Sequence, residues 1–200
     1  MTETQILPSA VRDAADLASG PLRAVTPGQL TAPTPCGDYD VRALVDHLAW
    51  AAVLSQRAAT RMPLEHDWSS LTPAPFLDGL PVEQWAAAVP AELDSAAAAW
   101  ADPAAWEGET VIGSTEMPAG VVGPMMLAEF VLHGWDLAQA IGAPYDVPAD
   151  LGEAVLAAVE PLASMGRDGG WYGPEVPVPA DASAFDRALG LTGRDPARRR

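Results

Sequence analysis

The sequence feature that most constrains the fold is the segment 123–142, GPMMLAEFVLHGWDLAQAIG. Pro124 suits the first position of a helix, and Gly142 suits the residue just after its end. On a helical wheel, apolar side chains surround this segment almost completely. They are Phe130, Val131, Leu132, Trp135, Leu137, Ala138 and Ile141. A helix that is apolar on all sides is a buried helix, so we expect the rest of the chain to pack around it.

Three ionisable residues interrupt this apolar helix. Glu129 and His133 are four residues apart and Asp136 is three further on, so all three share one stripe of the helix. A buried carboxylate and a buried imidazole are costly unless they meet a partner. A divalent metal ion satisfies both, which makes Glu129 and His133 candidate ligands. Asp136 has three open roles: orienting a ligand histidine, binding substrate, or making a structural hydrogen bond.

A second helix, expected over 39–62, contributes another inward imidazole. His47 lies away from the narrow polar arc of this helix, among small and apolar neighbours. The arc consists of Arg42, Asp46 and Gln56. Taken alone, His47 is most simply a core histidine bonded to a backbone carbonyl. Beside the helix that carries Glu129 and His133, it becomes a candidate third metal ligand.

Composition excludes several classes of function. The chain has 27 acidic residues against 11 Lys and Arg, a formal net charge of −16, which argues against nucleic acid and anionic membrane surfaces as partners. Cys36 is the single cysteine, so no intramolecular disulfide can form. No apolar run reaches the length of a membrane span, and the N-terminal residues lack the pattern of a signal peptide. We therefore expect a cytoplasmic protein.

Helical periodicity, few β-branched residues and proline-rich loops predict an all-α, single-domain protein. The core should be an up-and-down four-helix bundle, with Asp38 capping its second helix. The four helices are expected over 4–25, 39–62, 81–101 and 123–142. Peripheral helices are expected over 151–165 and 182–191, and the segment 102–122 favours a loop or a short β-hairpin around 110–112. We place the domain at 1–195 and treat 196–200 as a basic tail.

The remaining candidates carry less weight. His66 stands between acids in a loop, and we do not assign it as a ligand. Cys36 precedes a helix N-terminus, which lowers a thiol pKa, but a packed and inert cysteine is the simpler interpretation. Trp50 and Trp135 are expected in the core, and Arg42 on the surface.

Two segments resemble the signatures of a known family. PTPCGDYDVRALVDHLAW, which contains His47, and EFVLHGWDLAQAIG, which contains Glu129 and His133, are similar to the two histidine motifs of the mycothiol-dependent maleylpyruvate isomerase family. The closing segment YGPEVPVPADASAFDRALGLTGRDP resembles that of short, stand-alone actinobacterial members. The resemblance implies a DinB-like (YfiT-like) four-helix bundle with a metal held by His47, Glu129 and His133.

The resemblance also implies a chemistry. Two histidines and a carboxylate form a common zinc set, and nickel or iron would accept the same ligands. The metal would activate the thiol of mycothiol, and the thiolate would add to a small electrophile in a transfer or isomerisation reaction. The alternative is a non-catalytic metal-containing bundle that binds a small ligand or a protein partner. Both are compatible with a monomer or a homodimer, and neither the electrophile nor the metal follows from the sequence.

Overall fold

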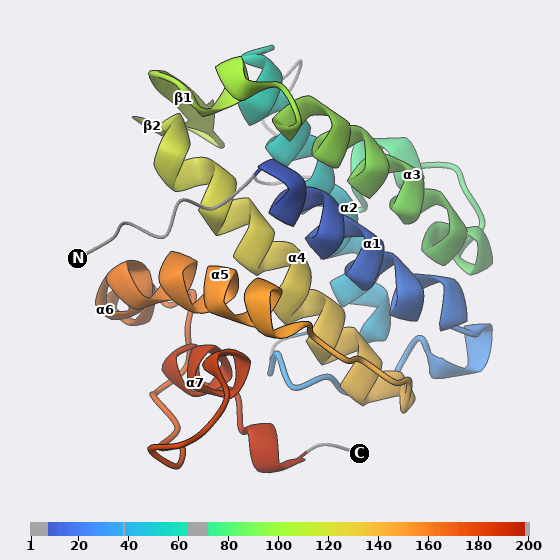
Figure 1. The fold of residues 1–200 in the computed structure, drawn as a ribbon. Coiled ribbons are helices and arrows are strands. Elements are labelled where there is room, and N and C mark those ends of the chain that lie inside the picture. The colour runs from blue at the N-terminus through green and yellow to red at the C-terminus, as the bar shows by residue number, and fades with distance from the viewer. Residues whose placement is uncertain (1–7, 38, 64–71, 199–200) are drawn as a thin grey trace.

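The structure is a computed structural model and describes residues 8–37, 39–63 and 72–198. It is an all-α, DinB-like bundle with peripheral helices and one small hairpin, as predicted (Figure 1). The bundle helices are α1 (Pro8–Ala24), α2 (Val41–Thr60), α3 (Val82–Trp100) and α4 (Ala119–Ile141). The peripheral helices are α5 (Ala149–Val159), α6 (Ala163–Asp168) and α7 (Ala184–Leu191). Strands β1 (Glu109–Ile112) and β2 (Thr115–Pro118) pair antiparallel before α4.

The helix directions differ from the predicted up-and-down arrangement, in which consecutive helices are antiparallel. Helix α1 packs between α3 and α4, and α2 packs between the same two helices on the other side. Helices α2 and α3 run in the same direction, because Arg42 lies over the ring of Trp85 near their N-termini, while Trp100 donates a hydrogen bond to Ser55 near their C-termini. The end of α2 and the start of α3 therefore lie at opposite ends of the bundle, about 30 Å apart along the α2 axis.

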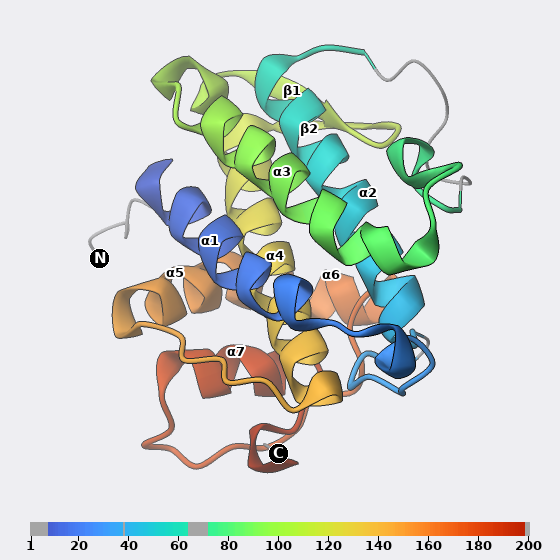
Figure 2. The same cartoon turned by 90° about the vertical axis from the view of Figure 1, so that its right-hand side faces the viewer.

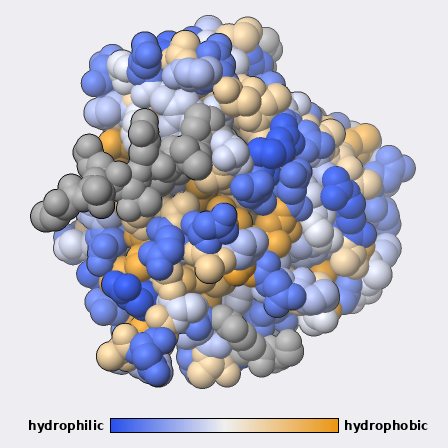
Figure 3. Space-filling view, in the orientation of Figure 1, coloured by the Kyte–Doolittle hydropathy of each residue, from blue (hydrophilic) through white to orange (hydrophobic). Residues whose placement is uncertain are grey.

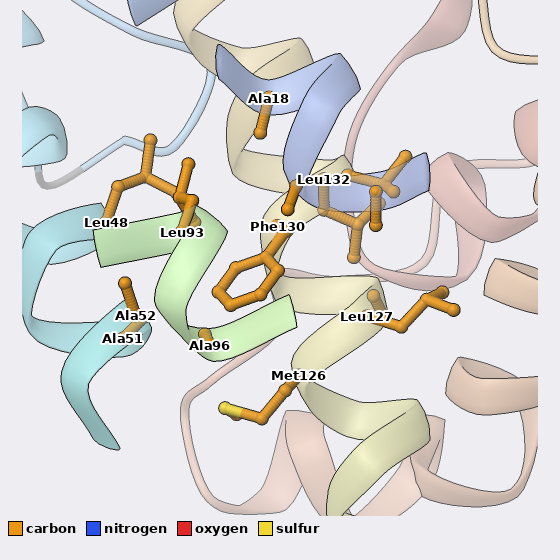
Figure 4. Packing of buried hydrophobic residues seen from close by; sticks show 14 of the residues in the cluster. Ala18, Leu48, Ala51, Ala52, Leu93, Ala96, Met126, Leu127, Phe130 and Leu132 are labelled. Atoms are coloured by element: carbon orange, nitrogen blue, oxygen red, sulfur yellow. The ribbon is translucent and has the colours of Figure 1, made fainter. Parts of the chain in front are cut away.

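The core surrounds α4, as its apolar pattern predicts. Figure 4 shows the ring of Phe130 directed from α4 toward Leu93 and Ala96 of α3, and Phe130 is fully buried. Helices α1 and α4 approach closely at Gly134, where a Cβ atom would lie only 3.1 Å from the Cα of Ala18. Hydrophilic residues cover much of the face in Figure 3, as expected for a chain with this many acids. No helix in the described ranges is long and apolar enough to cross a membrane.

Several element boundaries differ from the prediction. Helix α4 begins at Ala119, so Pro124 lies inside the helix rather than at its first position. This is tolerated because the carbonyl that loses its donor belongs to Gly120, which is exposed. Helix α2 begins at Val41 and is capped by the Asp40 carboxylate, which accepts the amide of Ala43; the predicted cap, Asp38, lies outside the described residues.

The peripheral layer also departs in detail. The helix predicted over 151–165 is divided into α5, a 3-10 turn over Glu160–Leu162, and α6, because Pro161 has no amide hydrogen to continue the α-helix. Helix α5 packs across α4, and α7 packs on α5 (Figure 2). This layer brings the C-terminal residues back to the C-terminal half of α4, where Arg194 contacts Asp136. The described residues end in a 3-10 turn, Pro196–Arg198.

Candidate metal centre

The three candidate ligands meet between α2 and α4. Glu129 and His133 project from the same side of α4 because they are four residues apart, and His47 faces them from the antiparallel neighbour α2. His47 Nε2 lies 2.6 Å from Glu129 Oε1, and His133 Nε2 lies 3.4 Å from the same oxygen. The two imidazole rings meet edge to face, with centroids 4.8 Å apart. The structure thus brings together all three residues that the sequence singled out.

The spacing of the donor atoms is compatible with a shared ion. One ligand atom from each residue lies within 4.8 Å of the other two. Ligands about 2.0–2.2 Å from a tetrahedral ion lie about 3.4 Å from each other. The distance from His133 to Glu129 already has this value, whereas the contact of His47 with Glu129 has a hydrogen-bond length and would open by about 0.8 Å. With three protein ligands, a fourth position is left for water or substrate.

In the absence of metal, the charged groups of the cluster shift one another's pKa values. Burial lowers the pKa of His133, but the charge of Glu129 and the hydrogen bonds to Asp136 and Glu129 outweigh it and raise this pKa to about 9. Burial raises the pKa of Glu129, yet its contacts with His133 and His47 hold that pKa well below its ordinary value. The metal-free cluster is therefore an ion pair in which a proton on His133 faces the Glu129 carboxylate.

Asp136 contacts the ring nitrogen of His133 that faces away from Glu129. Its Oδ2 lies 3.0 Å from His133 Nδ1, so this nitrogen carries a hydrogen and Nε2 remains directed at Glu129. The Asp136 side chain is completely buried and also receives hydrogen bonds from the guanidinium of Arg194. Of the three roles left open for Asp136, the hydrogen bond to His133 is the one this geometry supports, and direct contact with a substrate is not accessible to it.

Arg194 is the residue that sequence reasoning missed. Although it stands next to the basic C-terminal tail, its side chain is only 8% exposed. A signal was present in the sequence: Gly193 follows the last helix where a C-terminal cap is expected, and such a turn sends the next residue back toward the helix. What the sequence did not reveal was the acid that this arginine would meet.

Two aromatic residues flank His47. Trp50 stacks on its ring at a centroid distance of 5.4 Å, and Tyr39 lies 5.1 Å from it on a tilted plane. Both are half-buried, so Trp50 borders the cluster rather than belonging only to the core. Trp135 is buried, as expected, and Arg42 is an exposed residue that pairs with the Trp85 ring. His66 falls outside the described residues, and its exclusion from the site stays a prediction.

Cys36 is half-buried beside the cluster. One ligand atom each of Cys36, His133 and Asp136 lies within 4.8 Å of the others, forming a second group of metal-ligand type. The guanidinium of Arg194 contacts both oxygens of Asp136 in that group. A cation bound there would face an existing positive charge, so we assign no ion to this second group.

A separate cavity of about 410 Å³ opens at the C-terminal end of α4. Its walls come from residues 33–35, the last turns of α4, Val176, residues 193–195 and Arg198. The lining includes Arg194 but, among the described residues, none of the three candidate ligands. It is therefore distinct from the cluster formed by His47, Glu129 and His133.

The fold and the cluster define a DinB-like helical bundle with a candidate metal-ligand group between two facing helices. The sequence matches the family described as "Mycothiol maleylpyruvate isomerase N-terminal domain" over residues 11–138. The chain belongs to this family, which confirms the resemblance deduced from its two histidine motifs. The match ends within α4, so α5, α6, α7 and Arg194 lie beyond it.

Two curated relatives are similar over most of the chain. They are "Uncharacterized protein MT0763" and "Uncharacterized protein Rv0738" from two strains of Mycobacterium tuberculosis. Each is 27% identical over 169 residues, which cover 83% of this chain and 85% of the relative. No solved structure matches the chain at a significant level. The relatives thus extend the similarity past the family's own domain without assigning an activity.

Proposed function

We propose that this protein binds a divalent metal ion, zinc in the first place and nickel or iron as alternatives, through His47, Glu129 and His133. We further propose that it uses the ion in a mycothiol-dependent transfer or isomerisation of a small electrophile. The observation that carries the proposal is the meeting of two imidazole nitrogens from α2 and α4 at one carboxylate oxygen, Glu129 Oε1. Membership of the mycothiol maleylpyruvate isomerase family supports the choice of thiol.

The accessibility of the ligands fits a small-molecule site. The side chains of Glu129 and His47 are 26% and 19% exposed, whereas that of His133 is 10% exposed. A small molecule would therefore approach from the side of Glu129 and His47. Trp50 and Tyr39 border His47 there and supply half-buried aromatic surface against which such a molecule could pack.

The residues of the chain have separate roles in this proposal. His47 and Glu129 offer donor atoms at the accessible side, and His133 offers Nε2 from the buried side. When bound, the divalent ion would lower the pKa of a small thiol and supply a nucleophile at neutral pH. The side chains of Trp50 and Tyr39 would hold the thiol and the electrophile beside the ligands and limit the access of water.

The metal part is tested with alanine variants of the three ligands. His47→Ala, Glu129→Ala and His133→Ala should each lose bound zinc, measured by elemental analysis after dialysis and by competition with a chromophoric chelator. Helical circular dichroism should largely persist, because the ion completes the site rather than nucleating the bundle. His66→Ala is the matched control and should retain full zinc. Full zinc in all three ligand variants, or loss of zinc from the His66 variant, would show that the wrong residues were chosen.

The thiol part is tested with the zinc-loaded wild type. Calorimetry with mycothiol should show binding that disappears in the metal-free protein, and a panel of small electrophiles should yield thiol conjugates or isomers. Mycothiol binding without turnover would favour the alternative, a non-catalytic metal-containing bundle. An absence of thiol binding to the zinc form would refute the thiol-dependent function. A cytoplasmic location, a monomeric or homodimeric state and the absence of nucleic acid and membrane partners are further parts of the proposal.

A further inference from the structure

We propose that Arg194 is a positioning residue that fixes His133 for metal binding by holding Asp136. This inference rests on the proposed metal site, and it assigns a role there to the C-terminal segment beyond the family's matched residues 11–138. The chain of contacts is short. Arg194 binds Asp136, Asp136 binds His133 Nδ1, and His133 Nε2 faces Glu129.

The contact between Arg194 and Asp136 is bidentate. Arg194 Nε donates to Asp136 Oδ1 at 2.9 Å and to Oδ2 at 3.1 Å, while its terminal nitrogen Nη2 donates to Oδ2 at 2.7 Å. The guanidinium therefore fixes the carboxylate plane, and with it the direction in which Oδ2 accepts from His133 Nδ1. A lysine, with a single point of charge, would leave the carboxylate free to rotate.

Local backbone geometry aims Arg194 at this site. After α7, the amide of Gly193 donates a hydrogen bond to the carbonyl of Gly190 at 3.1 Å. The amide of Arg194 donates a hydrogen bond to the carbonyl of Leu189 at 2.8 Å. These two bonds form a Schellman turn, in which Gly193 adopts the left-handed conformation with φ of +84°. Gly193 also packs on Gly173, since a Cβ atom at Gly193 would lie 2.6 Å from the Cα of Gly173. The turn is thus fixed from two sides.

A purely structural ion pair is a weaker explanation of this arrangement. A buried salt bridge adds little stability compared with apolar residues of similar volume, because both charges lose their hydration. Here one oxygen of Asp136 also serves the histidine whose other nitrogen faces the candidate ion site. Outer partners of this kind typically change metal affinity by about 10–100-fold when they are removed.

The experiment is a double-mutant cycle on zinc affinity in the full chain. The variants are Arg194→Met, Asp136→Asn and their combination, and zinc is titrated against a competing chelator. We expect Arg194→Met to weaken zinc binding about 10–100-fold and to have no further effect in the Asp136→Asn background. Arg187→Met is the matched control: Arg187 lies on α7 in an exposed pair with Glu160, and its loss should leave the affinity unchanged.

A spectroscopic measurement separates positioning from support of the fold. In ¹⁵N-histidine-labelled zinc protein, the Nδ1–H resonance of His133 should shift in Arg194→Met, while circular dichroism stays that of the wild type. If Arg194→Met does not fold, Arg194→Lys is used instead. This variant keeps the positive charge but loses the bidentate hydrogen bonds to Asp136, and it should weaken zinc binding several-fold. Unchanged zinc affinity and an unchanged His133 resonance in a folded Arg194 variant would overturn this inference while leaving the metal site intact. An absence of zinc binding in the wild type would overturn both.

Discussion

Raising the pH should lower the unfolding free energy of the metal-free protein and should increase the apparent affinity of the protein for zinc. Both trends come from His133, whose pKa rises from an ordinary 6.5 to about 9 in the fold because Glu129 and Asp136 outweigh the effect of burial. A group with a raised folded pKa stabilises the fold fully below its unfolded value and loses this contribution as the pH passes the folded value. For the metal-free protein, stability should therefore fall between about pH 6.5 and 9.

The magnitude follows from the two pKa values. At about 1.4 kcal/mol for each pH unit, the interval from 6.5 to about 9 corresponds to about 3 kcal/mol of unfolding free energy. The imidazole is nearly buried, so solvent screens this interaction little. Zinc must displace the same proton from His133, and its apparent affinity should therefore rise about tenfold for each pH unit up to about pH 9.

The assay combines two titrations over the range pH 6.5 to 9.5. Urea denaturation of the chelator-treated protein gives the unfolding free energy, and competition with a chelator of known pH dependence gives the zinc affinity. Glu129→Gln is the control for the first titration, because it removes the charge that contributes most to raising the His133 pKa and should flatten the curve. A metal-free wild type whose stability stays constant from pH 6.5 to 9.5 would refute this account of the cluster.

Two further predictions concern the scaffold. Phe130→Ala should destabilise the protein by about 3–5 kcal/mol in urea denaturation, because removing its fully buried ring would leave a cavity. Val111→Ala is the control and should change the stability little, because Val111 is 54% exposed. Equal effects of the two substitutions would contradict the placement of the core. Gly193→Ala should destabilise the fold more than Gly142→Ala, since both glycines have positive φ but only at Gly193 would the new Cβ meet the backbone, that of Gly173. Thermal denaturation compares the two variants, and equal losses would argue against that close approach.

Much of the fold was predictable because periodicity records burial. The apolar residues on all sides of α4 identified the central helix. The apolar neighbours of His47 on α2 predicted that its side chain points inward, and it faces α4 in the structure. What periodicity does not record is the direction of one helix relative to another. The parallel course of α2 and α3 is fixed by contacts between distant residues, such as Trp100 with Ser55, which local patterns do not specify. The early start of α4 was missed because the proline rule favours the first turn, and here the preceding hairpin sets the start instead.

The site was predictable to the extent that its residues share a helix or a motif. Glu129, His133 and Asp136 lie within two turns of α4, so their common stripe is visible in the sequence. His47 could be proposed as a third ligand because its motif resembled that of a family. Arg194 lies 58 residues from Asp136 and belongs to no common period with it, so only the packing of the C-terminal layer reveals the pair. Contacts between residues so far apart in the chain are difficult to predict from a single sequence.

The charge balance of the buried cluster leads to a last prediction. Without metal, the charges of Glu129 and Asp136 are balanced by those of Arg194 and protonated His133. A divalent ion that replaces the proton on His133 leaves one positive charge in excess, and a small anion such as a thiolate would restore neutrality. The S-methyl thioether of mycothiol cannot ionise, so it should bind the zinc form at least about tenfold more weakly than mycothiol does. The metal-free form, which is already neutral, should bind neither of the two in calorimetry. Equal affinities for the zinc form would show that the excess charge does not select the ligand.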